Sequence, residues 1–467
     1  MTTKDIKSVY FIGAGGIGMS ALARYFASRG VVVAGYDRTP SALTAQLEKE
    51  GILLHYEEDV EQIPHACRNR ETTLVVFTPA IPERHRELVF FRENNFTVMK
   101  RAQVLGILTE THRGLCFAGT HGKTTTSAMC AHIMHQSQTD CNAFLGGISK
   151  NYSTNYILSK HSDYVVIEAD EFDRSFHWLR PWMSVITSTD ADHLDIYGTK
   201  EAYLESFRHY TTLIKPGGAL IIHQGLEMRP ETAESVRVYD YSRDGGDFHA
   251  ENIRISDGEI TFDFISPLEC VRDVRLGQPV PINIENGVAA MAMAQLNGCT
   301  GEELRYGMST YKGVDRRFDF KIKTRRIVLL SDYAHHPKEI LQSARSIRQL
   351  YSERRITAIF QPHLFTRTRD FHKEFADALS LLDEVVLTEI YPARELPIKG
   401  VSSRLIYDDL AAGVEKHLIS KDSVLEFVRQ HDFEVLIVLG AGDIDNLVPE
   451  IEKILREKYG APGDNRP

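Results

Sequence analysis

The sequence predicts an α/β protein in three parts, because strand and helix patterns alternate in three successive stretches of the chain. Two observations indicate this fold class. Short apolar runs end in glycine loops, and two of these loops lead into segments whose apolar residues have helical spacing. The length of 467 residues is enough for roughly two to four domains of ordinary size.

The first stretch has the pattern of a parallel nucleotide-binding fold. A strand is expected at residues 9–12, followed by a glycine loop, and further buried strands are expected at residues 31–35 and 74–77. The helix after the loop has an apolar face with i, i+3, i+4 and i+7 spacing, made by Met19, Leu22, Ala23 and Phe26.

The second stretch begins with a strand at residues 114–118 that again runs into a glycine loop. Buried strands are expected at residues 164–167 and 184–187. Residues 225–282 change to an alternation of apolar and polar side chains, which predicts a small antiparallel region. A helix is expected at residues 287–296.

The third stretch has the βαβ rhythm of a doubly wound sheet. Strands are expected at residues 327–330, 356–360, 384–387 and 434–439. Helices alternate with these strands, including one with an apolar face made by Ile340, Ala344, Ile347 and Tyr351.

Composition narrows the class of protein. The net charge of -10 argues against a nucleic-acid-binding protein, which needs a basic surface. No apolar run approaches the roughly 18 residues of a membrane span, and the first residues lack the apolar core of a signal peptide. The six cysteines are scattered and form no CxxC pair, so we expect reduced thiols in a cytoplasmic protein and no zinc site.

The first glycine loop has the pattern GxGxxG, with Gly13, Gly15, Gly16 and Gly18, and Asp37 follows at the end of the next strand. Such glycines let a backbone approach a pyrophosphate, while the acidic residue binds a ribose hydroxyl. An NAD(P)-dependent oxidoreductase is therefore one interpretation. The motif itself requires only a ligand that carries a diphosphate.

The second glycine loop ends in Gly-Lys-Thr, as a P-loop does, although its early glycine is displaced to Gly119. Backbone amides of such a loop surround phosphates, Lys123 would reach the outer phosphates of ATP, and Thr124 would bind Mg²⁺. The phosphate-binding residues expected here are Gly119, Thr120, His121, Gly122, Lys123, Thr124 and Thr125. A simple oxidoreductase does not explain this second loop.

Carboxylates follow the strands at residues 164–167 and 184–187, where ligands bind in α/β sheets. The first cluster begins with Glu168 and the second contains His193. Together with Thr124, these two side chains are candidate Mg²⁺ ligands. For His193, a hydrogen-bonded turn residue is an equally valid interpretation, because Mg²⁺ prefers oxygen ligands.

The third stretch places unusual polar sequences after four of its strands, at residues 332–337, 361–369, 391–395 and 440–443. Four such loops at one sheet edge suggest a site. Arg367 or Arg369 would bind a carboxylate or phosphate, and His335 and His363 would orient or deprotonate an amine.

Taken together, these motifs resemble the Mur ligases. The resemblance is carried by Gly-Thr-His-Gly-Lys-Thr-Thr at 119–125, Glu-Ala-Asp-Glu at 168–171, Asp-His-Leu-Asp at 192–195 and Asp-Tyr-Ala-His-His-Pro at 332–337. Gln-Pro-His at 361–363 and Tyr-Pro-Ala-Arg-Glu at 391–395 are similar to the branch of the family that adds alanine. It spans residues 9 to 445.

The resemblance implies three domains: a Rossmann-like domain for a UDP-sugar (residues 1–107), a central P-loop ATPase domain with a mostly parallel sheet (residues 108–314) and a C-terminal Rossmann-like domain for the amino acid (residues 315–467). The first glycine loop, Asp37 and Thr78 then hold a UDP diphosphate and its neighbourhood. The same resemblance assigns Asn286, Arg317 or Arg316, and Asp332 to ATP, and Tyr333, His335, His363 and Arg367 to alanine.

The implied reaction is ATP- and Mg²⁺-dependent ligation of L-alanine to UDP-N-acetylmuramic acid through an acyl phosphate, by a monomer or homodimer. A recycling ligase that adds a tripeptide to the same sugar is the nearest alternative. The chain departs from the family where Leu364 and Phe365 replace a common Arg-Tyr pair, which leaves Arg367 to bind the alanine carboxylate. It also has Glu285 where the family often has histidine.

Overall fold

The computed structural model describes residues 6–192, 194–256, 259–393 and 395–460. The chain forms two compact units. The first comprises Met1–Asn252, Phe262–Val274 and Glu285–Lys312, and the second comprises Ile253–Thr261, Arg275–Ile284 and Gly313–Pro467.

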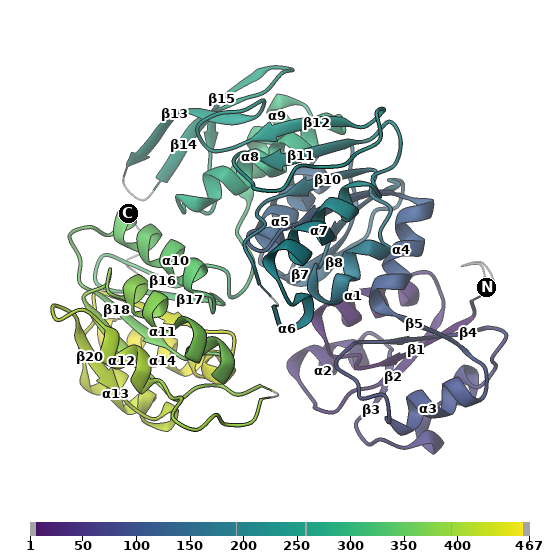
Figure 1. The fold of residues 1–467 in the computed structure, drawn as a ribbon, viewed down its shortest axis with the longest axis horizontal. Coiled ribbons are helices and arrows are strands. Elements are labelled where there is room, and N and C mark those ends of the chain that lie inside the picture. The colour runs from purple at the N-terminus through teal and green to yellow at the C-terminus, as the bar shows by residue number, and fades with distance from the viewer. Residues whose placement is uncertain (1–5, 193, 257–258, 394, 461–467) are drawn as a thin grey trace. The chain divides into compact units, whose positions relative to one another are not determined.

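The first unit begins with a five-stranded parallel sheet of order β3-β2-β1-β4-β5 (Figure 1). Its strands are β1 (Ser8–Ile12), β2 (Val32–Tyr36), β3 (Leu53–His55), β4 (Thr73–Phe77) and β5 (Thr97–Lys100). The helices between them are α1 (Ile17–Ser28), α2 (Ala42–Lys49), α3 (Arg86–Glu93) and α4 (Arg101–Thr111). β1 and β4 are buried throughout, which explains their continuous apolar sequences.

A seven-stranded sheet follows, with the order β12-β11-β10-β6-β9-β7-β8. Its strands are β6 (Arg113–Ala118), β7 (Asn142–Ser149), β8 (Thr154–Ile157), β9 (Tyr164–Glu168), β10 (Met183–Ile186), β11 (Ala219–His223) and β12 (Arg237–Tyr241). All neighbouring strands are parallel except β7 and β8. The accompanying helices are α5 (Lys123–Gln136), α6 (Leu194–Tyr197), α7 (Lys200–Thr211), α8 (Ile282–Leu296) and α9 (Gly301–Thr310).

The stretch at residues 225–282 differs from the predicted antiparallel region in one respect. Its first strand, β12, joins the central sheet in parallel with β11. The remainder forms a separate three-stranded sheet from β13 (His249–Ser256), β14 (Glu259–Ile265) and β15 (Cys270–Arg275). All six cysteines are free thiols; Cys270 on this sheet is exposed and the other five are buried.

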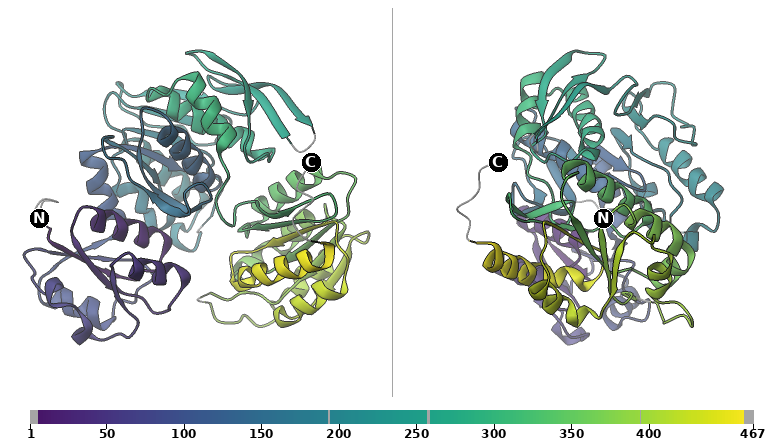
Figure 2. Two further views of the ribbon diagram at one scale, coloured as in Figure 1. Left: turned by 180° about the vertical axis from the view of Figure 1, so that it is seen from behind. Right: turned by 90° about the vertical axis from the view of Figure 1, so that its left-hand side faces the viewer.

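The second unit contains a six-stranded sheet of order β16-β17-β21-β18-β19-β20, parallel except for β16. Its strands are β16 (Asp319–Lys323), β17 (Val328–Asp332), β18 (Ile356–Phe360), β19 (Glu384–Leu387), β20 (Glu415–Leu418) and β21 (Val435–Leu439). Helices α10 (Pro337–Leu350), α11 (Phe365–Leu379) and α12 (Arg404–Asp409) cover one face, and α13 (Val424–Gln430) and α14 (Val448–Tyr459) cover the other (Figures 1 and 2). The predicted doubly wound sheet is confirmed.

Both glycine loops lie at carboxyl ends of parallel strands, after β1 and β6. Helix α1, which follows the first loop, packs against β7 and β8 of the central sheet. The fold therefore brings the first loop to the sheet that carries the second. Among the residues that the structure describes, no helix is both long and apolar enough to cross a membrane.

Candidate active site

The second glycine loop connects the central strand β6 to α5. Gly119 and Gly122 have φ angles of 135° and 83°, a region that favours glycine. A Cβ atom at Gly119 would lie 2.1 Å from the Thr187 hydroxyl oxygen, so glycine also permits the close approach of the segment after β10. The loop thus leaves its amides at the start of α5, as phosphate binding requires.

The P-loop lysine is held by an acidic partner. Lys123 Nζ donates to the Glu171 carboxylate at 2.9 Å, and the Glu171 side chain is only 2% exposed. Burial lowers the pKa of Lys123, but the carboxylates of Glu171, Glu168 and Asp170 outweigh that effect and hold the pKa above its ordinary value. Lys123 is therefore a charged ammonium, ready to bind phosphate.

Two of the predicted magnesium ligands lie in direct contact. Thr124 Oγ1 donates to the Glu168 carboxylate oxygens at 2.9 and 3.1 Å. A Cβ atom at Gly146 would lie 1.8 Å from Glu168 Oε2 and 3.0 Å from Thr124 Oγ1, so this glycine on β7 makes room for the pair. A hydroxyl and a carboxylate are hard oxygen donors, which fit Mg²⁺. The third predicted ligand, His193, lies outside the described residues, as does Arg394 of the 391–395 motif.

The other residues of the loop connect it to the segment after β10 and to α8. Thr120 Oγ1 donates to the Asp190 carbonyl at 2.7 Å, and the His121 amide donates to the Ser188 hydroxyl at 2.8 Å. Thr126 Oγ1 donates to Asn286 Oδ1 at 3.3 Å. Asn286, expected near the ATP base, therefore lies beside the first turn of α5, where Thr125 also lies.

In the first glycine loop, Asp37 contacts the loop itself. Its Oδ2 accepts a hydrogen bond from the Gly15 amide at 2.7 Å, and its Oδ1 accepts one from the Thr39 amide at 3.1 Å. Gly13 has a φ angle of 89°, and its position against Thr78 leaves only 2.7 Å between a hypothetical Cβ atom and the threonine methyl group. Asp37 and Thr78 thus shape the loop, and their contact with a ligand stays a prediction.

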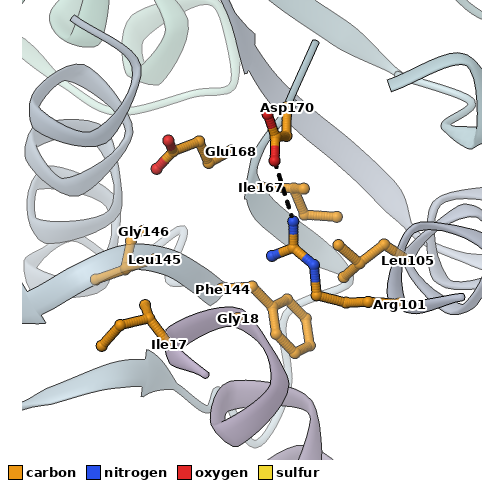
Figure 3. Close-up of a pocket in the computed structure, with 10 residues that line it drawn as sticks. All are labelled: Ile17, Gly18, Arg101, Leu105, Phe144, Leu145, Gly146, Ile167, Glu168 and Asp170. Atoms are coloured by element: carbon orange, nitrogen blue, oxygen red, sulfur yellow. Dashed lines mark ion pairs between the residues drawn. The ribbon is translucent and has the colours of Figure 1, made fainter. Parts of the chain in front are cut away.

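A cavity of about 200 Å³ lies between the two glycine-loop regions (Figure 3). Its lining includes Gly18 from the start of α1, Arg101 from the start of α4, and Glu168 and Asp170 after β9. Arg101 and the roles of Glu171 and Gly146 were not predicted from the sequence. A basic pair, Lys100 and Arg101, between two strand patterns was the available signal for Arg101.

The second unit brings together five residues expected to bind alanine or ATP. The rings of His335 and His363 lie 5.6 Å apart, and His363 stacks on Tyr391 at 5.7 Å. Arg316 and Arg317 lie over the Tyr333 ring, with guanidinium carbons 4.7 and 5.1 Å from its centroid. The loops that follow β17, β18 and β19 thus meet at this sheet edge, and their binding of alanine or ATP stays a prediction.

Both histidines are neutral near pH 7. Burial, the neighbouring His335 and Arg367 lower the pKa of His363 to about 4. Burial likewise lowers the pKa of His335, whose Nδ1 lies 2.9 Å from the Tyr333 carbonyl oxygen. If Nδ1 carries the proton in that hydrogen bond, Nε2 of His335 is left as an acceptor.

Asp332, expected near the ATP ribose, is 8% exposed and accepts a hydrogen bond from Ser343. Burial raises its pKa. Leu364 precedes α11 with a φ angle of 72°, an unusual conformation for a side chain of this size. Arg367 lies in the first turn of that helix.

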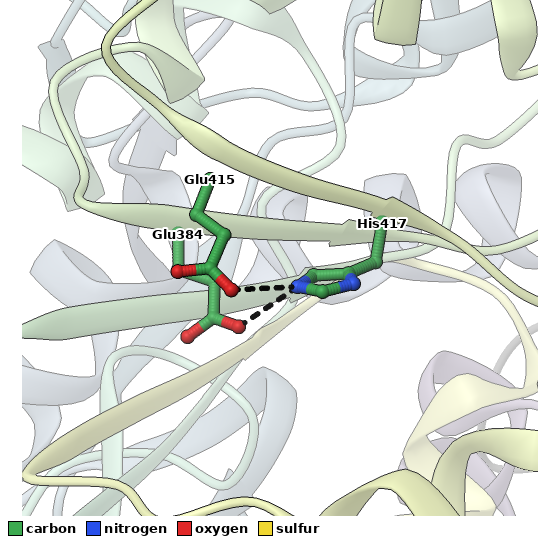
Figure 4. A group of neighbouring side chains, drawn as sticks. All are labelled: Glu384, Glu415 and His417. Atoms are coloured by element: carbon green, nitrogen blue, oxygen red, sulfur yellow. Dashed lines mark hydrogen bonds and ion pairs between the residues drawn. The ribbon is translucent and has the colours of Figure 1, made fainter.

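A different group of potential metal ligands, Glu384, Glu415 and His417, lies at the amino ends of β19 and β20 (Figure 4). His417 Nε2 lies 3.1 Å from Glu384 and 3.4 Å from Glu415. Arg355 lies 3.4 Å from Glu384 and 2.5 Å from Glu415. Because arginine already compensates both carboxylates, and ligands bind at the opposite edge of such sheets, this is an ion-pair cluster.

Family models cover most of the chain. The Mur ligase family catalytic domain matches residues 8–113, the Mur ligase middle domain matches residues 117–294, and the Mur ligase glutamate ligase domain matches residues 316–442.

The chain is also similar to named relatives. It is 64% identical to the UDP-N-acetylmuramate–L-alanine ligase of Phocaeicola vulgatus, over 98% of this chain and 100% of that protein. The protein of the same name from Parabacteroides distasonis is 57% identical, over 99% and 100%.

Among solved structures, UDP-N-acetylmuramate-alanine ligase from Thermotoga maritima has a TM-score of 0.79 at 26% identity, covering 97% of this chain and 99% of that one. A murein peptide ligase from Psychrobacter arcticus has a TM-score of 0.67 at 19% identity, covering 96% and 98%. Family models, relatives and fold agree over nearly the whole length, and the chain belongs to the Mur ligase family.

Proposed function

We propose that this chain ligates L-alanine to the lactyl carboxylate of UDP-N-acetylmuramic acid, with ATP converted to ADP and phosphate, in the synthesis of peptidoglycan precursors. The observation that carries the proposal is the cavity of Figure 3. Gly18 of the diphosphate-type loop and Glu168, the partner of Thr124 in the P-loop, line the same space. A UDP-sugar and ATP would therefore present their reacting ends to one another.

In the first step, an oxygen of the lactyl carboxylate attacks the γ-phosphorus of ATP, and the bond to the β-phosphate oxygen breaks. The product is an acyl phosphate, whose phosphate is a far better leaving group than the oxygen of a carboxylate. Lys123 stabilises the charge on the transferring group. Thr124 and Glu168 would hold Mg²⁺, which neutralises phosphate charge when bound.

In the second step, the neutral amine of L-alanine attacks the acyl carbon, and phosphate leaves. The amine proton passes to a base, for which His335 and His363 are the candidates because both are neutral. Arg367 would bind the alanine carboxylate. In this proposal, residues 1–107 bind the UDP-sugar, residues 108–314 bind ATP and residues 315–467 bind alanine. Because ATP and the UDP-sugar are cytoplasmic metabolites, the proposed location is the cytoplasm.

The alternatives have weaker support. The relatives that are 53–64% identical over nearly the full chain carry the alanine ligase name, whereas the murein peptide ligase is 19% identical. An oxidoreductase function would not explain the P-loop or its Lys123–Glu171 and Thr124–Glu168 pairs.

Phosphate release separates these functions. The assay contains ATP, Mg²⁺ and UDP-N-acetylmuramic acid, with L-alanine, with tripeptide, or with neither. We expect release that depends on both the sugar and alanine and is weak with tripeptide. Release only with tripeptide would make the chain a recycling ligase. No release with either amine would exclude both ligase functions.

A further inference from the structure

Arg101 has an unusual position at the start of α4. A Cβ atom at Gly18 would lie 1.9 Å from its Nη1, so the guanidinium group lies directly over this glycine of the first loop. Its ionic partner is Asp170, with Nη2 and Oδ2 separated by 3.5 Å and the two side chains 28% and 37% exposed. Among the described residues, the guanidinium forms this long ion pair and no shorter hydrogen bond, so a ligand can replace Asp170 as its partner.

The neighbouring cation is engaged differently. Lys100 Nζ donates to Asp173 at 2.7 Å, a complete charge-assisted hydrogen bond. Lys100 does not line the cavity, whereas Arg101 extends into it toward Asp170 (Figure 3). Lys100 is therefore bound to another side chain of the protein, whereas Arg101 faces the cavity, so Lys100 is a suitable control for Arg101.

The charges around the cavity define what Arg101 can bind. Glu168, Asp170 and Arg101 line it, so one positive group faces two negative ones. The diphosphate of a UDP-sugar has the amides of the first glycine loop as partners. The lactyl carboxylate has no such partner there and must lie close to the γ-phosphate, whose metal-binding end is marked by Glu168 and Thr124. The flat fork of an arginine matches a carboxylate at two atoms.

We infer that Arg101 binds the reacting carboxylate of the UDP-sugar, which replaces Asp170 as its partner, and holds it beside Glu168 for phosphorylation. This inference rests on the proposed function, because it requires a substrate that carries both a diphosphate and a carboxylate. Asp170 compensates Arg101 while the sugar is absent. Arg101 is thus a substrate-positioning residue, and glycine at position 18 leaves space for the guanidinium above the loop.

Two UDP-sugars that differ only in the lactyl group provide the test. Calorimetry, without ATP or metal, would give the dissociation constants of UDP-N-acetylmuramic acid and UDP-N-acetylglucosamine for wild type, Arg101→Met, Arg101→Lys and Lys100→Met. We expect Arg101→Met to weaken binding of the muramic acid compound by about tenfold to hundredfold and binding of the glucosamine compound by less than about twofold. Arg101→Lys should retain part of the wild-type preference for the muramic acid compound, and Lys100→Met should change neither dissociation constant.

If Arg101→Met weakened the binding of both UDP-sugars equally, the guanidinium would contact the diphosphate and the inference would be overturned. Unchanged binding of both compounds would also overturn it. A wild-type protein that binds neither sugar would overturn the proposed function as well. Asp170→Asn gives a second measurement if the arginine variants do not fold. It removes the competing carboxylate and should tighten binding of the muramic acid compound alone, by about twofold to tenfold; weaker or unchanged binding would contradict the exchange of partners.

Discussion

The Lys123 ammonium lies 2.8 Å from Oε2 of Glu171, a buried carboxylate in the segment that follows β9. Each group compensates the other, and in the proposed mechanism the phosphates of ATP would compete with Glu171 for the lysine. The pair therefore links catalysis to stability, since removal of Lys123 leaves the buried Glu171 carboxylate without its cation.

Lys123→Met should abolish activity and also destabilise the protein. We expect turnover to fall by more than about a hundredfold, since such contacts are worth several kcal/mol. The unfolding free energy should fall because Glu171 loses its cation. The double variant Lys123→Met with Glu171→Gln should regain stability without regaining turnover, as measured by urea unfolding and phosphate release. A single variant that keeps more than about a tenth of wild-type turnover would remove Lys123 from the mechanism.

Gly146→Ala should impair catalysis through Glu168. The added methyl group would lie 1.8 Å from Glu168 Oε2 and must displace the carboxylate from Thr124. We expect the Mg²⁺ concentration for half-maximal activity to rise by about tenfold or more, while ATP binding without metal changes little. Gly413→Ala is the matched control, because no atom lies within 4 Å of the Cβ position there. An unchanged magnesium dependence would exclude Glu168 as a ligand.

Arg367→Met should raise the KM for L-alanine by about tenfold to hundredfold and leave the KM for the UDP-sugar unchanged, because it removes a charged partner of the amino-acid carboxylate. Arg369→Met serves as the control. Arg369 lies on the same helix but is 52% exposed and paired with Asp370 at 2.7 Å. Steady-state kinetics with each substrate varied in turn would give the two KM values. Equal effects of the Arg367 and Arg369 substitutions would argue against a specific role for Arg367.

Acid should destabilise the first unit through His132. This side chain is 3% exposed and forms hydrogen bonds with Tyr152 and Thr310, and burial, His135 and Lys312 lower its pKa to about 4 from 6.5. Between about pH 6.5 and pH 4, His132 therefore binds a proton in the unfolded chain but not in the folded protein. This contribution to stability is complete above about pH 6.5 and is lost as the pH falls towards 4.

The measurement is urea unfolding at pH 7.5 and pH 5. His132→Gln should be less stable than wild type at pH 7.5 yet lose less stability on acidification. His161→Gln, at a side chain that is 67% exposed, should have the same pH dependence as wild type. If the wild type and His132→Gln lose equal stability between the two pH values, His132 is not a source of the acid sensitivity.

The sequence predicted the strands and loops whose signals are local. β1, β6 and β18 are continuous apolar runs buried on both faces, and glycines at fixed spacing mark both phosphate loops. Strands β7 and β8 were not predicted. β7 contains Gly146 and its neighbouring glycine, which weaken the strand pattern, and Gly146 makes room for Glu168 and Thr124.

Long-range contacts explain the parts of the site that were not predicted from the sequence. The Asp37 carboxylate, whose contact with a ligand stays a prediction, also accepts a hydrogen bond from the Gly15 amide, which only the folded loop reveals. Arg101 lies over Gly18, and Lys123 pairs with Glu171; in both cases the two residues are far apart in the sequence. Contacts of this kind depend on how loops from separate strands meet in the fold, and the periodicity of the sequence does not predict that arrangement.

The burial of five of the six cysteines makes the natural sequence convenient for labelling. Burial raises the pKa of the thiols of Cys67 and Cys116 to about 11 and about 12, which suppresses the reactive thiolate, whereas Cys270 on β15 is exposed. A maleimide dye should therefore attach at one defined position of the folded protein. Fluorescence could then follow ligand binding with every glycine-loop residue unaltered.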